Sequence, residues 1–443
     1  MRSKFSGSLL LFLVLVTAQT LYAKTTPETL ARRATSANVS ESASAIAALR
    51  ELGPSGLYAL RQVHAQEIDR QIANPLLAAT PEWQRLSLAL DAVSQQKDSY
   101  LSGLYWYTDF DQAKAAARAT GKPILSLRLL GKLNEEFSCA NSRFFRTILY
   151  SNEEVARTLR ERFILHWQSE RPAPRVTIDF GDGRKLERTL TGNSIHYILD
   201  SDGHPLDALP GLYGPAAFRR ELIAIEGLVQ QAAKKENANL IHTLSLYQRD
   251  RLNKVNLGWL ADIEKIGGKV PEGFVVVKRQ DGTPEALQVA SLAITKMVTE
   301  ASMLRSMTAA PEALGAVTDE AAWKKIALFH IADAELDARS IGLIQRQTQK
   351  AFQAEAAASD SNKTLAKLVE KLQMNIAMDT VRNEYLMHTK LYAWLIAYRS
   401  HNDLDALNKK VYAELFLTPA SDPWLGLFSP ETYVALEGGG IVR

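Results

Sequence analysis

The stretch GKPILSLRLLGKLNEEFSCANSRFFRTILYSNEEVARTLRERFILHW, residues 121–167, alternates apolar runs of strand length with helical patterns. The runs ILSLRLL (124–130) and FILHWQ (163–168) are apolar enough to be buried strands. Between them we expect one helix to begin near Cys139, and another near Ser151, where Glu154 three residues later completes a capping box. This alternation predicts an α/β fold.

Two turn signals follow this stretch. The GDG at 181–183 separates VTIDF from RKLERTL and predicts a hairpin, and the DSDG at 200–203 separates SIHYILD from PLDALPG. The DSDG run is similar to the start of a calcium loop, but the later ligands are missing, so we interpret it as a turn. An amphipathic helix ends at Gly121, and a last helix begins near Pro215. These elements define an α/β domain over residues 104–232.

The flanking regions are helical in pattern. Residues 24–103 form a helical N-terminal region in which Thr-Pro-Glu at 26–28 and at 80–82 combines an N-cap, a first-turn proline and a first-turn acid. Residues 233–443 are predicted to form an α-helical C-terminal domain, either separate from the α/β domain or wrapped around it. Further helix starts are expected in this domain, at 283–285, 311–312 and 429–431.

The first residues have the pattern of a secretory signal peptide. Arg2 and Lys4 precede an apolar run from Leu9 to Val16, and small residues at Ala18 and Ala23 offer cleavage sites, of which we prefer Ala23. The run is shorter than the roughly 20 residues that span a bilayer. We therefore expect residues 1–23 to be removed, leaving an extracytoplasmic protein, periplasmic or secreted, without an integral membrane segment.

Charge and composition limit the possible partners. The formal net charge is +3, and removal of Arg2 and Lys4 with the signal leaves 3 − 2 = +1. A near-neutral chain offers no electrostatic basis for binding nucleic acid or an anionic membrane. We expect the partner to be another extracytoplasmic protein, and no motif predicts a cofactor.

The chain has a single cysteine, Cys139. It cannot form an internal disulfide, so the fold depends on packing. An unpaired thiol in an oxidising compartment is buried and inert, joined to another molecule, or kept for chemistry. Burial is the commonest of these outcomes.

A family resemblance rests on the order of four segments. GKPILSL, then Cys139-Ala140-Asn141-Ser142, then NEEVARTLRERFILHW, and finally GNSIHYILDSDGHPLDALPG together resemble an extracytoplasmic thioredoxin-like domain. The resemblance covers residues 104–218 and implies a central mixed sheet flanked by helices. It also implies that Cys139 takes the position of the nucleophilic cysteine and Ser142 that of the resolving cysteine. A helix N-terminus and Arg143 would stabilise a thiolate there.

The departures from that family weaken a redox role. Ser142 gives a CxxS motif, and a hydroxyl cannot resolve a mixed disulfide. Ser194 stands at the position where thioredoxin-like proteins usually carry a cis-proline, and we expect a trans bond before it because a non-proline cis bond costs about 3 kcal/mol. Glu135 and Glu136 are expected to raise the pKa of the Cys139 thiol.

Several other residues are candidates for a functional site. Glu384 with His388 and His330 with Asp333 have spacings that place them on one helix face, which suits metal ligation in helical bundles. Such spacings arise often by chance, so we interpret them as ordinary polar residues and predict no metal. His166 and Trp167 are candidates to line a cleft, with helix packing favoured for the indole. The apolar residues that we expect to dock on the body or bind a partner are Trp424, Leu425, Leu427 and Phe428.

The sequence therefore predicts an exported thioredoxin-like protein without a resolving cysteine. We favour a non-catalytic interaction or scaffold module. The alternative is a monothiol disulfide-handling protein, an isomerase or mixed-disulfide former, that uses Cys139 as nucleophile.

Overall fold

A computed structural model of the 443-residue chain describes residues 26–190, 192–232, 237–267, 320–355, 361–397 and 403–425, with Ala435 and Ile441. The predicted signal peptide and the helix starts expected at 283–285, 311–312 and 429–431 lie outside the described residues.

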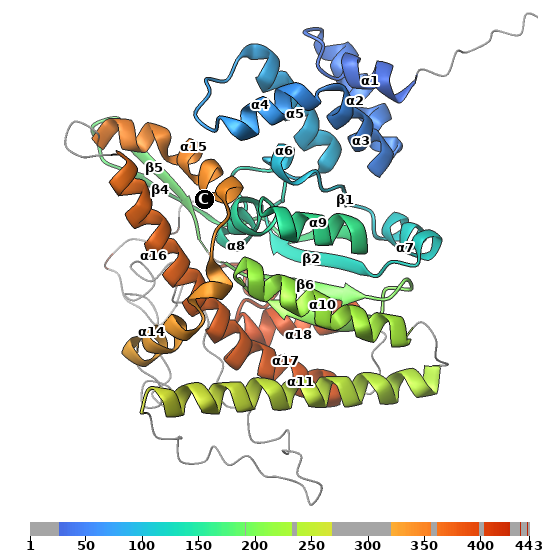
Figure 1. Ribbon diagram of the computed structural model, residues 1–443, viewed down its shortest axis with the longest axis vertical. Helices are drawn as coiled ribbons and strands as arrows, with labels where there is room; N and C mark the ends of the chain where they lie inside the picture. Colours follow the sequence, from blue (N-terminus) through green and yellow to red (C-terminus); the bar gives the residue numbers. More distant parts are fainter. Residues whose placement is uncertain are drawn as a thin grey trace, which may run out of the picture.

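A five-stranded mixed sheet lies at the centre of the molecule (Figure 1). Its strand order is β1-β3-β2-β6-β7, in which β1, β3 and β2 are parallel, β6 is antiparallel to β2, and β7 is antiparallel to β6. The predicted strands are confirmed, and the sequence missed β1 because two residues are too few to give a pattern. The strand bounds are β1 Trp106–Tyr107, β2 Ile124–Leu130, β3 Ile164–Arg171, β6 Ser194–Leu199 and β7 Pro205–Pro210.

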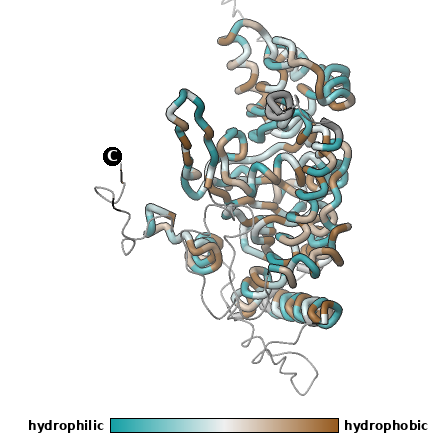
Figure 2. The backbone as a smooth tube through the Cα atoms, turned by 90° about the vertical axis from the view of Figure 1, so that its left-hand side faces the viewer, coloured by the Kyte–Doolittle hydropathy of each residue, from teal (hydrophilic) through white to brown (hydrophobic). Residues whose placement is uncertain are grey.

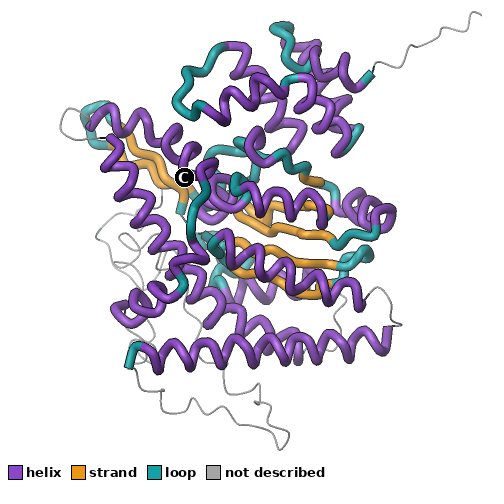
Figure 3. The backbone as a smooth tube through the Cα atoms, in the orientation of Figure 1, coloured by secondary structure: helices purple, strands orange, loops and turns teal. Residues whose placement is uncertain are grey.

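The central strands are covered on both faces. Every residue of β2, β6 and β7 is buried, which explains why these segments read as apolar runs instead of alternating patterns. Figure 3 shows the strands enclosed by helices. The helices that connect the strands are α7 Phe110–Thr120, α8 Ala140–Phe144, the π-helix η1 Phe145–Leu149 and α9 Glu153–Arg162, and α10 Pro215–Ala232 follows the last strand.

The ends of these helices follow local chemistry. The Asp109 side chain accepts a hydrogen bond from the backbone of Gln112 at the start of α7, and Gly121 ends that helix with a φ of 70°. The predicted capping box is wrong: α9 is capped by Asn152, whose side chain accepts from the backbone N–H of Val155. Ser151 lies one residue too early, and its hydroxyl donates to the Thr147 carbonyl instead.

The predicted hairpin is confirmed as a separate two-stranded antiparallel sheet of β4 Arg175–Asp179 and β5 Lys185–Thr189. The predicted turn at 200–203 also forms. The Asp200 carboxylate accepts hydrogen bonds from the backbone N–H groups of Asp202 and His204, each at 2.9 Å. The Asp200 carboxylate therefore stabilises the turn to which it belongs.

The N-terminal helices have a core of their own. Thr26 and Thr80 cap α1 and α5 as predicted, with proline in the first turn of each helix. Leu343, from the C-terminal part of the chain, joins this core. The helices are α1 Pro27–Arg33, α2 Val39–Glu51, α3 Pro54–Val63, α4 Ala65–Ala73, α5 Pro81–Ser94 and α6 Ser99–Ser102.

The C-terminal helices share one hydrophobic core with the sheet. The residues of this core come from positions between Leu104 and Leu425 of the sequence. The long helix α11 lies along one end of the molecule, and its turns alternate between hydrophobic and hydrophilic residues (Figure 2). The coarse prediction, a mixed sheet flanked by helices with a helical C-terminal region, is confirmed. The elements are α11 Asn237–Lys265, α14 Glu320–Phe329, η3 Ile331–Ala334, α15 Ala338–Glu355, α16 Ser361–Arg382, η4 Asn383–His388, α17 Thr389–Ala397, α18 Leu404–Lys410 and η5 Val411–Leu415.

Candidate functional site

Cys139 is the N-cap residue of α8, as the sequence predicts. Its backbone N–H donates to the carbonyl of Leu130 at the end of β2 (3.1 Å), and its carbonyl accepts from the backbone N–H of Arg143 (3.1 Å). The side chain is fully buried. The loop from β2 therefore brings the thiol to a helix N-terminus but inside the core.

Burial dominates the electrostatics of the thiol. It raises the pKa of Cys139, and hydrogen bonds from Ser142 together with the charge of Arg143 oppose that shift only in part. The prediction that Glu135 and Glu136 cause the rise is wrong. The Glu135 carboxylate pairs with Lys132 (3.0 Å) and that of Glu136 with Lys97 (3.3 Å), so lysines at the protein surface offset both negative charges.

Ser142 is also fully buried. Its hydroxyl donates to the Cys139 carbonyl at 2.9 Å, one helical turn back. This contact is local side-chain capping, so Ser142 supports the turn that holds the cysteine.

Ser194 opens β6 and pairs with Leu129 of β2. The described residues contain no cis peptide bond, which confirms the trans bond before Ser194. A side chain at Gly192 would meet the amide oxygen of Asn141 at 2.6 Å, so this loop lies directly against α8. The fold thus brings the loop of Ser194 and the helix of Cys139 together, as predicted from their positions.

A segment near the C-terminus closes over this loop. The side-chain amide of Asn193 donates to the hydroxyl of Thr418 (2.8 Å), and the Tyr412 hydroxyl donates to the Asn193 carbonyl (3.3 Å). Arg171 donates to the carbonyls of Thr418 (3.2 Å) and Asp422 (2.8 Å). We call residues 411–422 the cover segment.

The cover segment is anchored by apolar side chains as well as by hydrogen bonds. Val411, Leu415 and Phe416 are buried in the core shared with the sheet. Burial raises the pKa of the Tyr412 hydroxyl, and the charges of Glu170 and then of Cys139 add to the rise. The Tyr412 ring is therefore close enough to the thiol to interact with it electrostatically. The sequence did not predict this contact, because nothing local in Asn193 or Thr418 indicates a partner so distant in the chain.

The end of the described C-terminal segment only partly matches its prediction. Leu425 is buried against the body, while Trp424 is 44 % exposed. Leu427 and Phe428 lie outside the described residues.

Arg128 is a buried charge on the central strand β2. Its side chain is 3 % exposed and pairs with Glu170 of β3 (3.2 Å) and Asp405 of α18 (3.4 Å). Burial raises the pKa of Glu170 despite that pair. The pair ties the end of the sheet to the helix that precedes the cover segment.

His166 and Trp167 point to different neighbours. The His166 ring is 2.8 Å from the Ser126 hydroxyl, and burial lowers its pKa to about 3, so the ring is neutral. The Trp167 indole donates to the carbonyl of Gln95 at the end of α5 (2.9 Å), which confirms helix packing. The ring of another buried histidine, His196, forms a 2.7 Å hydrogen bond with the Tyr150 hydroxyl.

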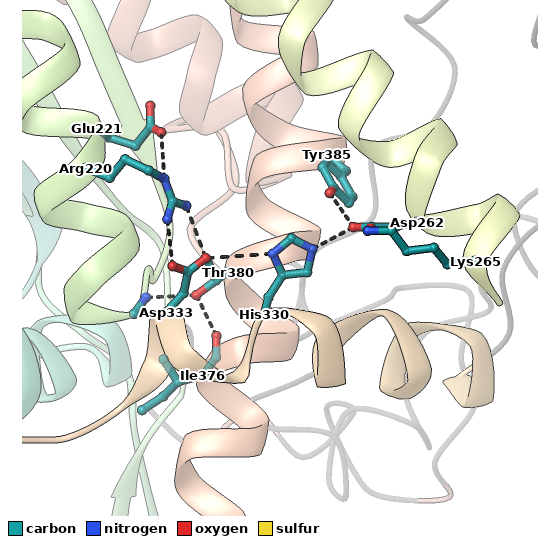
Figure 4. A network of polar contacts seen from close by, with 10 residues as sticks. Arg220, Glu221, Asp262, Lys265, His330, Asp333, Ile376, Thr380 and Tyr385 are labelled. Carbon is teal, nitrogen blue, oxygen red and sulfur yellow. Dashed lines mark hydrogen bonds and ion pairs between the residues drawn. The ribbon is translucent and has the colours of Figure 1, made fainter.

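His330 and Asp333 belong to a chain of polar contacts between helices (Figure 4). The His330 ring lies 2.6 Å from the Asp262 carboxylate and 3.7 Å from that of Asp333. Arg220 donates two hydrogen bonds to Asp333, at 2.6 and 3.1 Å. The two predicted candidates thus lie together, but their side chains are engaged in ion pairs.

Glu384 and His388 lie in the π-helix η4. His388 is fully buried, stacks on Tyr392 at 4.2 Å and lies 3.6 Å from the Asp207 carboxylate. Burial raises the pKa of Glu384, with the charge of Glu221 adding to that effect. Within the part of the chain that the structure describes, no group of three or more His, Cys, Asp or Glu side chains is arranged so that it could hold a metal ion.

Comparisons with known proteins give no family for this chain: no family model matches it, and neither does any curated protein or solved structure. Among the described helices, none is both long and apolar enough to cross a bilayer.

Proposed function

We propose that this protein is an extracytoplasmic, thioredoxin-like interaction module that has no thiol chemistry of its own. Support for the thioredoxin-like part comes from the position of Cys139 at the start of the helix after β2. It also comes from the loop of Ser194 beside that helix, within a mixed sheet flanked by helices. Its partner is another extracytoplasmic protein.

One observation carries the non-catalytic assignment: the thiol is fully buried, in a core that it shares with the cover segment. Cys139 has no exposed surface, and the loop that faces its helix is tied to Thr418 through Asn193. A nucleophilic cysteine needs both access and thiolate character. Burial opposes both here, and it raises the pKa of the thiol.

The monothiol alternative is favoured by the helix N-terminus and by Arg143, which both act to lower the pKa of Cys139. Desolvation is the larger influence. The alternative therefore requires the cover segment to leave before any chemistry begins.

Alkylation of Cys139 with iodoacetamide tests the proposal. Because the chain has one cysteine, the incorporated label reports this site alone. We expect no labelling of the folded protein and rapid labelling once denaturant unfolds it. Labelling of the folded protein at the rate of a free thiol, with a midpoint below the ordinary thiol pKa of about 8.5, would establish the monothiol alternative instead.

Chemical cross-linking in the extracytoplasmic fraction tests the binding role. The wild type and Cys139→Ala should capture the same proteins, since the thiol makes no contact with a partner. A captured protein that depends on Cys139 and is released by reductant would contradict the proposal.

A further inference from the structure

Both ring nitrogens of His330 face carboxylates. Nε2 lies 2.6 Å from Asp262, and Nδ1 lies 3.7 Å from Asp333. A neutral imidazole carries one N–H and presents a lone pair at its other nitrogen, whereas the imidazolium donates from both. The arrangement therefore suits the charged ring, which attracts both carboxylates at once.

The two carboxylates are held in place by further donors. Arg220 of α10 donates to Asp333, while Lys265 (2.8 Å) and the Tyr385 hydroxyl (2.7 Å) donate to Asp262. Figure 4 shows that the ring lies between these two groups. His330 is thus one of the links between α10 and η3 on one side and α11 and η4 on the other.

The segment that follows His330 contacts both the start of α9 and the N-terminal helical region. The Asp337 carboxylate accepts from the backbone N–H of Glu153 at the start of α9 (2.9 Å), and Ser340 contacts Ser151 (3.0 Å). Further on, Leu343 enters the core of the N-terminal helices, and Arg346 pairs with Asp98. We call residues 330–347 the strap.

We propose that protonation of His330 fastens the strap, so that its first turn is held to α11 under mildly acidic conditions and is released from Asp262 under alkaline ones. Release of His330 from Asp262 weakens the contacts that the strap makes with α9 and with the N-terminal helices. The strap thereby makes the attachment of the N-terminal helical region sensitive to the pH of the compartment.

The direction of the effect follows from the charges. The nearby Asp333 carboxylate raises the pKa of His330, and Asp262 adds to the shift against the effect of burial. The stabilisation is complete below the ordinary histidine pKa of about 6.5 and is lost as the pH rises through the higher folded value. On the acid side, burial raises the pKa of Asp333, but the nearby His330 ring and the hydrogen bonds from Arg220 outweigh it and hold the value at about 2.

Other titratable and charged groups surround the ring from each neighbouring element. Burial raises the pKa of Asp379 on α16 to about 7, which also favours the fold at lower pH, so the test must separate the two groups. The groups to be considered are Asp262 and Lys265 of α11, Asp333 of η3, Arg220 and Glu221 of α10, Glu384 and Tyr385 of η4, Asp379 and Arg382 of α16, and Glu320 of α14.

Hydrogen exchange of the full-length protein at about pH 6 and about pH 9, corrected for intrinsic exchange rates, tests the proposal. The protection of amides in the strap should fall on going to the higher pH, by about tenfold for each unit by which the fold raises the pKa of His330. His330→Gln should give the low protection at both pH values, and His330→Arg should lose the pH dependence attributable to this position. His204→Gln is the matched control, because His204 pairs with Asp200 in a distant turn.

A strap that keeps its wild-type pH dependence in His330→Gln would overturn the proposal. A second measurement requires no folded variant: in the wild type, the ring carbon resonance of ¹³C-labelled His330 should titrate with a midpoint above about 6.5. A midpoint at or below that value would overturn the proposal as well.

Discussion

The side chains of Asn193 and Thr418 form a 2.8 Å hydrogen bond across 225 residues of sequence. Both residues are buried. The bond fixes the cover segment on the loop that lies against the helix of Cys139, and it makes access to the thiol a property of the whole fold.

Thr418→Val should loosen the attachment of the cover segment to the loop at Asn193. The substitution keeps the shape but removes the acceptor for the Asn193 amide, and leaving a buried donor unpaired costs about 1–3 kcal/mol. We expect that loss in the free energy of unfolding measured with urea. Thr177→Val, on the exposed hairpin strand β4, is the control and should change stability by less than about 0.5 kcal/mol.

The same variant should also make Cys139 more reactive. If the cover segment opens locally, the rate of iodoacetamide labelling under native conditions rises by about tenfold for each 1.4 kcal/mol lost. Equal labelling rates in the wild type and in Thr418→Val would show that the cover segment does not control access to the thiol.

Arg128→Met should destabilise the protein by about 1–3 kcal/mol near neutral pH, because it leaves the partly buried Glu170 carboxylate without its ion-pair partner. Burial already raises the pKa of Glu170 in the wild type. The loss should therefore shrink as the pH falls and the carboxylate becomes neutral, which unfolding at about pH 5 and about pH 8 would reveal. The double variant with Glu170→Gln should recover most of the loss; a loss that is the same at both pH values would contradict this account.

Gly214→Ala should separate α10 from η3. A methyl group at this position would lie 2.1 Å from the backbone carbonyl oxygen of Asp333, so one of the two segments must move. We expect a loss of about 1–3 kcal/mol in unfolding free energy. Gly227→Ala, inside α10, is the control: nothing lies within 4 Å of the new methyl group, and the exchange should stabilise the helix by about 0.5–1 kcal/mol.

Asp379→Asn should stabilise the protein near neutral pH. Burial raises the pKa of Asp379 to about 7 from an ordinary 3.8, so the folded state disfavours the ionised carboxylate. The gain in melting temperature should be largest above about pH 7 and should disappear below about pH 4, where the carboxyl is neutral in both states. Asp250→Asn, which alters an exposed ion pair on α11, should leave the melting temperature nearly unchanged. A gain that persists in acid would rule out this origin.

Local sequence patterns predicted the strands and the helix boundaries well. Residues 124–130 and 194–199 are continuously apolar because both faces of their strands are buried, and Thr80 with Pro81 begins a helix by its own hydrogen bonding and fixed dihedral angle. The capping error at Ser151 was one residue in size, since Asn152 competes for the same role. Strand β1 is too short for any periodicity to reveal it.

The candidate site was predicted in its parts but not in its environment. Cys139 at a helix start and Ser194 in the adjacent loop follow from the order of the elements. The state of the thiol does not, because Cys139 is buried in a core to which Tyr412 and its neighbours from the far end of the chain also belong. Desolvation is therefore the main cause of the raised pKa of Cys139, in place of the charges of Glu135 and Glu136 that the sequence alone made prominent.

The sequence by itself determined the elements of the α/β region and the single thiol at the start of a helix, since each depends on neighbouring residues. Only the tertiary structure decided that Asn193 meets Thr418 and that His330 lies between Asp262 and Asp333. The strength of a charge or a hydrogen bond depends on how much water remains around it. That water is removed by packing between residues far apart in the chain, which no local pattern encodes.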